Sequence, residues 1–150
     1  MPRRRAWVAD DVGSAALEFI TVGVILLVPF IYLVLVLGAL QEQALGVESA
    51  ARHTARAVAL SGDEATAADA AREVVAAVAA EYGIDPASIE VALDCGPTAR
   101  ACPEPGATVT VTVRATARLP FVPPVLGLDE ATAIPLTASS VQKISSGGAP

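Results

Sequence analysis

Residues 13–40 read GSAALEFITVGVILLVPFIYLVLVLGAL, and this stretch decides how the rest of the chain can fold. Residues 19–40 contain no Asp, Glu, Lys, Arg, His, Asn or Gln. At 1.5 Å per residue, a helix over these residues is about 33 Å long, close to the roughly 30 Å hydrocarbon core of a bilayer. The sequence therefore predicts one transmembrane helix over residues 19–40.

The charges on either side of the span indicate its orientation. Arg3, Arg4 and Arg5 precede it, whereas the nearest charged residues after it are Glu42 and Glu48. Because Lys and Arg are retained on the cytoplasmic side, we expect the N-terminus inside and everything after the span outside. The protein should then be a single-pass protein of the cytoplasmic membrane, and its outer part could reach the cell surface or a pilus after assembly.

The part beyond the leader is acidic. The whole chain has 10 Lys and Arg and 16 Asp and Glu, and three of the arginines and two of the aspartates precede residue 14. The remainder therefore carries 7 basic and 14 acidic residues, a formal charge of −7. No basic patch is present to recruit nucleic acid, so we expect no nucleic-acid partner. The acidity is typical of a soluble, exposed domain.

A cleaved secretory signal is the alternative interpretation of the apolar stretch. Its n-region is basic, and the small residues Gly38 and Ala39 follow the run. However, the apolar core of a secretory signal usually has about 7–15 residues, and this run is longer. We therefore favour a span that stays in the mature protein.

The residues before the span resemble a class III signal, the leader of type IV prepilins and pseudopilins. In that pattern a short basic leader ends in Gly, and a Glu stands fifth in the mature chain. Here Gly13 ends the leader, Ser14 would be the first mature residue, Glu18 the fifth and Phe19 the sixth. The resemblance implies that a prepilin peptidase cuts between Gly13 and Ser14 and that the span survives.

Physical chemistry explains why these residue types fit such a signal. Gly has no side chain to obstruct the close approach of a peptidase to the scissile bond. Cleavage creates an α-amine on Ser14 whose reference pKa is about 7.7–8.0, so it is largely positive. In a bundle of identical helices, Glu18 of one subunit can face the Ser14 amine of another. That pairing would offset the cost of holding a carboxylate at the membrane edge.

The resemblance is most specific to the TadE-like family, the small pseudopilins of tight-adherence (Flp-type) pili. It rests on ALEF leading into the span, on Pro29 within it, and on ESAARHTARAV at residues 48–58, which is similar to the family's NAAREGARAA helix. It implies a subunit of a pilus assembly or secretion system. The expected partners are the membrane, the prepilin peptidase, other pilin or pseudopilin subunits and the pilus assembly platform, with no cofactor.

Hydrophobic periodicity predicts the remaining elements. The first helix should run from residue 14 through the membrane and bend at Pro29, because no break signal appears before Ser61 and Gly62. A second amphipathic helix is expected over residues 64–82, with Asp63 as its N-cap and Gly83 at its C-terminal end.

Alternating apolar residues then predict three strands, within residues 89–94, 108–119 and 133–143, the last with Pro135 at a sheet edge. The predicted fold class is α+β, with a long N-terminal transmembrane helix, a second helix and a small antiparallel sheet of about three strands.

Four segments follow from these elements. Residues 1–13 form a cleaved cytoplasmic leader and residues 14–60 a transmembrane and stalk helix. Residues 61–144 form an extracytoplasmic head, and residues 145–150 a disordered tail. The apolar, Pro-rich connection at residues 121–126 either covers the core or meets a partner.

Two cysteines and one histidine are the residues that could form a disulfide, bind a metal or take part in catalysis. Cys95 and Cys102 bracket a Gly-Pro turn signal between two strands, so in an exported domain they predict a disulfide; two free thiols are the alternative. A metal site is not expected, because four ligands are wanted and no second Cys or His pair exists. His53 is expected at the surface, since no nucleophile and acid accompany it.

Two classes of function remain after an enzyme is set aside. The first is a pseudopilin or minor pilin that assembles through its N-terminal helix. The second is a generic signal-anchored envelope protein with a small extracytoplasmic binding domain. The position of the leader cut discriminates between them, because only the first should lose 13 residues and keep its span.

Overall fold

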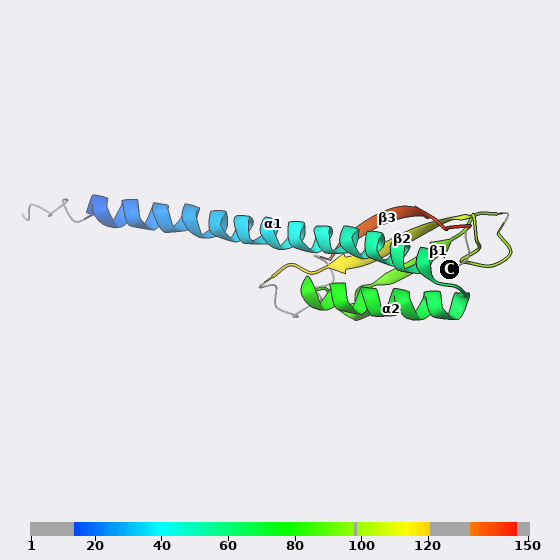
Figure 1. Ribbon diagram of the computed structural model, residues 1–150. Helices are drawn as coiled ribbons and strands as arrows, with labels where there is room; N and C mark the ends of the chain where they lie inside the picture. Colours follow the sequence, from blue (N-terminus) through cyan, green and yellow to red (C-terminus); the bar gives the residue numbers. More distant parts are fainter. Residues whose placement is uncertain (1–13, 98, 121–132, 147–150) are drawn as a thin grey trace, which may run out of the picture. The chain divides into compact units, whose positions relative to one another are not determined.

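The computed structural model describes residues 14–97, 99–120 and 133–146, and its elements give an α+β fold (Figure 1). In chain order they are α1 (Ser14–Leu60), α2 (Glu64–Glu81), the 3₁₀ turn η1 (Pro86–Ser88), β1 (Glu90–Asp94), β2 (Thr108–Ala117) and β3 (Ile134–Lys143). The three strands form one antiparallel sheet in the order β1-β2-β3. The predicted fold class is confirmed. The leader, the apolar segment at residues 121–126 and most of the predicted tail lie outside the described residues.

The chain divides into two compact units, Met1–Leu37 and Gly38–Pro150, called here the N-terminal and C-terminal units. The described part of the N-terminal unit consists of α1 alone, and this helix continues through Pro29. The C-terminal unit contains the end of α1 and all the other elements.

The core of the C-terminal unit forms between the two helices and one face of the sheet (Figure 1). Alternate residues of β2 are buried on this face, as the sequence pattern predicted: Val109, Val111, Val113, Ala115 and Ala117. The helices contribute mostly small residues to the same cluster: Val47, Ala50, Ala51, Ala55 and Val58 from α1, and Ala67, Ala71 and Val78 from α2. Because alanines project little, the helix backbones can pack close to the valines of the sheet.

Local signals in the sequence set both ends of α2. The Asp63 side chain accepts a hydrogen bond from the Thr66 backbone N–H at 2.9 Å, and this bond holds the pKa of Asp63 below its ordinary value. At the other end Gly83 has a φ of +62°, and the Ile84 N–H donates to the Ala79 carbonyl at 3.0 Å. This six-residue closure is the Schellman type of helix end, which favours glycine. Both predicted caps are confirmed.

A glycine turn and a bulge start β2. The Ala107 N–H donates to the Glu104 carbonyl at 3.0 Å, and Gly106 between them has a φ of +82°. With Pro105 before it, this is the geometry of a type II turn. The Gly106 N–H also donates to the Ile144 carbonyl, while the Ile144 N–H donates to the Ala107 carbonyl. Gly106 and Ala107 therefore both lie opposite Ile144, which makes a β-bulge with glycine in its first position.

Thr54 gives a prediction about stability. This α1 residue is fully buried, and its Oγ1 makes no hydrogen bond with any described residue. A buried hydroxyl without a partner costs about 1–3 kcal/mol, and valine has nearly the same shape without the polar atom. Thr54→Val should therefore raise the free energy of unfolding by about 1 kcal/mol in a denaturant titration of the full chain in micelles. Thr54→Ser, which keeps the hydroxyl and removes a methyl group, should instead lower it.

Candidate functional site

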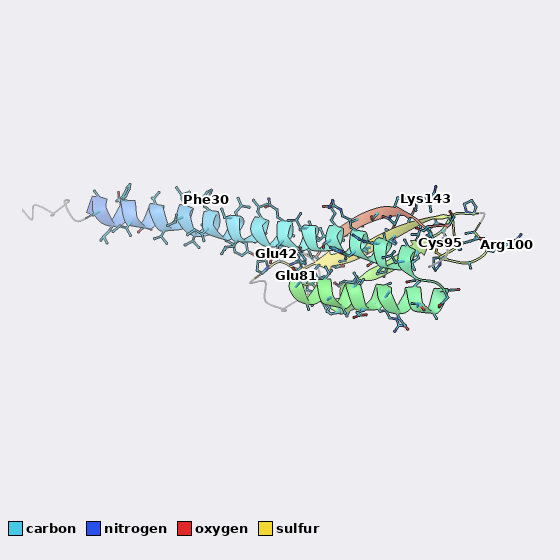
Figure 2. All side chains as sticks on the ribbon, in the orientation of Figure 1. Phe30, Glu42, Glu81, Cys95, Arg100 and Lys143 are labelled. Carbon is cyan, nitrogen blue, oxygen red and sulfur yellow. A yellow bond between two sulfur atoms is a disulfide. The ribbon has the colours of Figure 1, made fainter. Side chains whose placement is uncertain are left out.

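The N-terminal part of α1 carries apolar side chains that no other described residue covers. They project from all sides of the helix, as Figure 2 shows around Phe30. Phe19 is 80% exposed, and the large apolar residues from Leu17 to Leu37 are exposed with the exception of Val36. Within the described residues, α1 is thus long and apolar enough to cross a membrane, and it lies near the N-terminus.

The predicted assembly residues lie in the first turns of this helix. Glu18 and Phe19 are exposed residues of α1, and Ser14 is its first residue. Gly13, the other half of the predicted cleavage site, lies outside the described residues. The cleavage itself therefore stays a prediction.

Thr21 shows how a polar residue is accommodated in this apolar segment. Its Oγ1 donates a hydrogen bond to the Leu17 carbonyl at 2.7 Å, within the same helix. A hydroxyl satisfied in this way costs little in a hydrocarbon environment. The sequence reasoning did not single out this contact, although a Thr inside a predicted helix can donate to the carbonyl four residues earlier.

Cys95 and Cys102 are joined by a disulfide with a Cα–Cα distance of 5.6 Å. Further hydrogen bonds hold the chain around it: the Gly96 N–H donates to Asp94 Oδ1 at 2.8 Å, and the Arg100 N–H donates to Glu104 Oε2 at 2.9 Å. Figure 2 labels Cys95 and Arg100 in this region. Closing a loop of this length restricts the unfolded chain by roughly 2–3 kcal/mol in the chain-entropy model. The disulfide thus staples the segment that leads from β1 to β2.

In the described parts of the chain, the reactive and metal-ligating side chains do not assemble into a metal or catalytic cluster. No group of three or more His, Cys, Asp or Glu residues could hold a metal there. His53 is exposed on α1, beside the ion pair of Arg52 with Glu48. It lines a shallow surface hollow with Leu45, Ser49 and Tyr82.

A groove between α2 and β1 is a feature that the sequence reasoning missed. Val91 and Leu93 point to the helix side of the sheet, yet they remain 38% and 37% exposed. Their alternation predicted that they share one face of a strand, and the structure leaves that face only partly covered.

Comparisons of this chain with protein-family models, with curated proteins and with solved structures give no match.

Proposed function

We propose that this chain is a pseudopilin or minor pilin of a tight-adherence (Flp-type) pilus assembly or secretion system. The observation that carries the proposal is the character of α1. Its first 24 residues expose apolar side chains on every side, and the same unbroken helix then contributes Val47 to Val58 to a folded core. A helix of this kind can be held by lipid before assembly and by neighbouring helices after it.

The proposed pathway uses the residues at the start of the helix. A prepilin peptidase cuts after Gly13, and Ser14 becomes the new N-terminus of α1. The C-terminal unit lies outside the cytoplasm, where its disulfide can persist. The mature subunit then joins other pilin or pseudopilin subunits on the assembly platform, and its exposed apolar helix packs against theirs.

The second candidate is a signal-anchored envelope protein whose C-terminal unit binds a partner. The groove between α2 and β1 favours this candidate, because it offers a binding surface without any assembly. Such a protein would keep its leader and its three arginines on the cytoplasmic side of the anchor. The two candidates therefore differ in the mass of the mature chain.

Gly13→Leu tests the proposed processing. In a host that has a prepilin peptidase, the wild-type chain should be recovered without residues 1–13 and should begin at Ser14. The Gly13→Leu variant should keep the leader, because a leucine side chain obstructs the approach of the peptidase to the scissile bond. Intact mass and N-terminal sequencing of the membrane-extracted protein measure both results.

Val12→Leu is the matched control, since it adds the same residue type one position earlier and should be processed normally. A wild-type chain that begins at Met1 would favour the signal-anchored candidate. A wild-type chain that begins at Ala39 or Leu40 would favour a cleaved secretory signal. Either result would overturn the proposal.

A further inference from the structure

The groove between α2 and β1 has a volume of about 300 Å³ and is mostly apolar. Its apolar lining comes from α2, η1 and the start of the sheet: Ala71, Val75, Ala76, Pro86, Ile89 and Val91. Arg72 stands at its rim in an ion pair with Asp69. The groove therefore offers an aliphatic surface, and its polar groups stand at the edge.

The groove continues the core of the C-terminal unit instead of standing apart from it. Val91 pairs in register with the fully buried Val113, and Leu93 pairs with the fully buried Val111. Ala71 belongs to the core cluster and also lines the groove. The layer of apolar side chains thus extends past β2 to β1, where the cover from the helices is incomplete.

The backbone hydrogen bonds show that, among the described residues, β1 also has an unpaired main-chain edge. In antiparallel sheets the residues of a central strand bond alternately to the two neighbouring strands. The Ile144 N–H donates to the carbonyl of Ala107, an odd-numbered residue just before β2. By the alternation, the backbone groups of the odd-numbered residues of β2 therefore bond to β3. The even-numbered residues, such as Thr112, then bond to β1.

The side chains agree with this assignment. Thr112 Oγ1 and Ser139 Oγ lie 3.0 Å apart across β2 and β3. Side chains approach each other most closely at pairs that do not share main-chain hydrogen bonds, so Thr112 does not bond to β3 through its backbone. Its partner on β1 is Ala92, which leaves the backbone groups of Val91 and Leu93 directed to the outer edge. Among the described residues no strand pairs with that edge.

We propose that this groove and the outer edge of β1 bind an extended strand of another protein. The backbone of that strand bonds to Val91 and Leu93, and aliphatic side chains at every second position enter the groove beside Val75. Lys or Arg residues occupy the positions between them. This is strand addition, in which main-chain bonds supply affinity and alternate side chains supply specificity.

The charges around the groove select a basic partner. Asp69 forms an ion pair with Arg72, and Asp85 Oδ2 lies 3.6 Å from Arg118 Nη2. The charges of these four side chains are therefore compensated. Glu73 on α2 and Asp94 at the end of β1 are acidic residues outside these pairs, whereas Glu90 at the start of β1 lies opposite Arg114 of β2 in the register. A second copy of this acidic chain would bring like charges together along the edge, whereas a strand with Lys or Arg gains from them.

The opposite edge of the sheet differs in a way that supports the choice of β1. By the same alternation, the outward backbone groups of β3 belong to its odd-numbered residues. These include Pro135, which has no N–H to donate, and Lys143, and proline and lysine are the residues that commonly protect a sheet edge from pairing. On β1 the two outward positions are Val91 and Leu93, which offer no such protection.

The test measures binding of a synthetic peptide to the full chain in detergent micelles. The probe is a fluorescent nine-residue peptide that alternates Lys and Val, and its anisotropy reports the dissociation constant. Two control peptides keep its length, one with the same residues in blocks and one with Glu in place of Lys. We expect the alternating Lys-Val peptide to bind at least tenfold more tightly than either control.

Leu93→Pro and Leu93→Ala form the matched pair of variants. Both remove the leucine side chain, but only proline also removes the N–H at the outer edge, and neither change touches a bond from β1 to β2. Leu93→Pro should therefore bind the peptide at least tenfold more weakly than Leu93→Ala. Val75→Lys, which places a positive charge in the groove from α2, should also lose at least tenfold. Val141→Ala, at a 62% exposed position of β3, should bind like the wild type.

The outcomes separate this proposal from the proposed function, because the assay involves neither leader processing nor assembly. Equal binding of the three peptides, or equal binding by the two Leu93 variants when both remain folded by circular dichroism, would overturn the proposal. If Leu93→Pro does not fold, unchanged binding by Val75→Lys would overturn it. Dimerisation of the wild type in sedimentation that Leu93→Pro abolishes would assign the edge to a second copy, and would also overturn it.

Discussion

Replacing Gly46 with alanine is expected to destabilise the C-terminal unit by about 2 kcal/mol. A Cβ at this position would lie 2.7 Å from both Cβ and Cγ of Tyr82 and 3.0 Å from Cδ1 of Ile84. Tyr82 and Ile84 flank the glycine turn that ends α2, so hydrogen bonds at that helix end hold them in place. Overpacking of this kind costs about 1–3 kcal/mol, and contacts this short place Gly46 at the upper end. The better helix propensity of alanine offsets about 1 kcal/mol.

The measurement is thermal unfolding of the full chain in micelles, followed by circular dichroism. A loss of 2 kcal/mol in a unit of this size lowers the midpoint by about 10 °C. Gly38→Ala is the control, because a Cβ there meets nothing within 4 Å and only the helix propensity changes. It should leave the midpoint unchanged or raise it slightly. A Gly46→Ala midpoint at or above that of the wild type would show that the packing of α1 against Tyr82 is wrong.

The elements could be predicted from the sequence because local signals determine them. Ser61 and Gly62 follow the last residue of α1, Asp63 caps α2, and Gly83 ends it, each through interactions with residues a few positions away. The alternation in β2 likewise predicted its buried face, because a pleated strand places every second residue on one side. No knowledge of the packing was needed for any of these.

The features that the sequence did not reveal depend on residues far apart in the chain. In the sequence, Gly46 is only a residue of low helix propensity inside a helix. Its role in packing follows from the position of Tyr82, which leaves no room for a Cβ at Gly46. The groove at β1 depends on where α2 lies over the sheet, which no local pattern encodes. Thr54 reads as an ordinary helix residue, and only its burial makes the lone hydroxyl notable.

For the proposed assembly site, the sequence was more informative than the structure. Glu18 was singled out because a carboxylate at the start of an apolar run is unusual, and its spacing from Gly13 suggested a role. The structure adds that Glu18 is an exposed residue in the first turns of α1. Its proposed partner belongs to a neighbouring subunit, so only an experiment on assembled protein can test the pairing.

Glu18→Gln and Glu18→Ala are expected to abolish assembly and to leave membrane insertion and processing intact. Residues 19–40 are apolar enough to insert without the carboxylate, and its removal makes insertion easier. Without Glu18, however, the Ser14 amine of a neighbouring subunit has no partner at the membrane edge. Exposed ion pairs contribute about 0–1 kcal/mol, whereas leaving one partner of a shielded pair alone costs about 3–5 kcal/mol. Recovery in the assembled fraction should therefore fall at least tenfold.

The comparison of the two variants separates charge from size. Gln has nearly the shape of Glu, so if the charge matters, Glu18→Gln should fail as completely as Glu18→Ala. Thr21→Val is the control, because the Thr21 hydroxyl bonds within its own helix and its loss should leave assembly unchanged. Crosslinking and fractionation of the processed proteins measure all four chains. Normal processing together with wild-type assembly of both Glu18 variants would rule out the pairing. If only Glu18→Ala fails to assemble, the effect comes from side-chain packing and not from charge, because glutamine keeps the shape of glutamate without its charge.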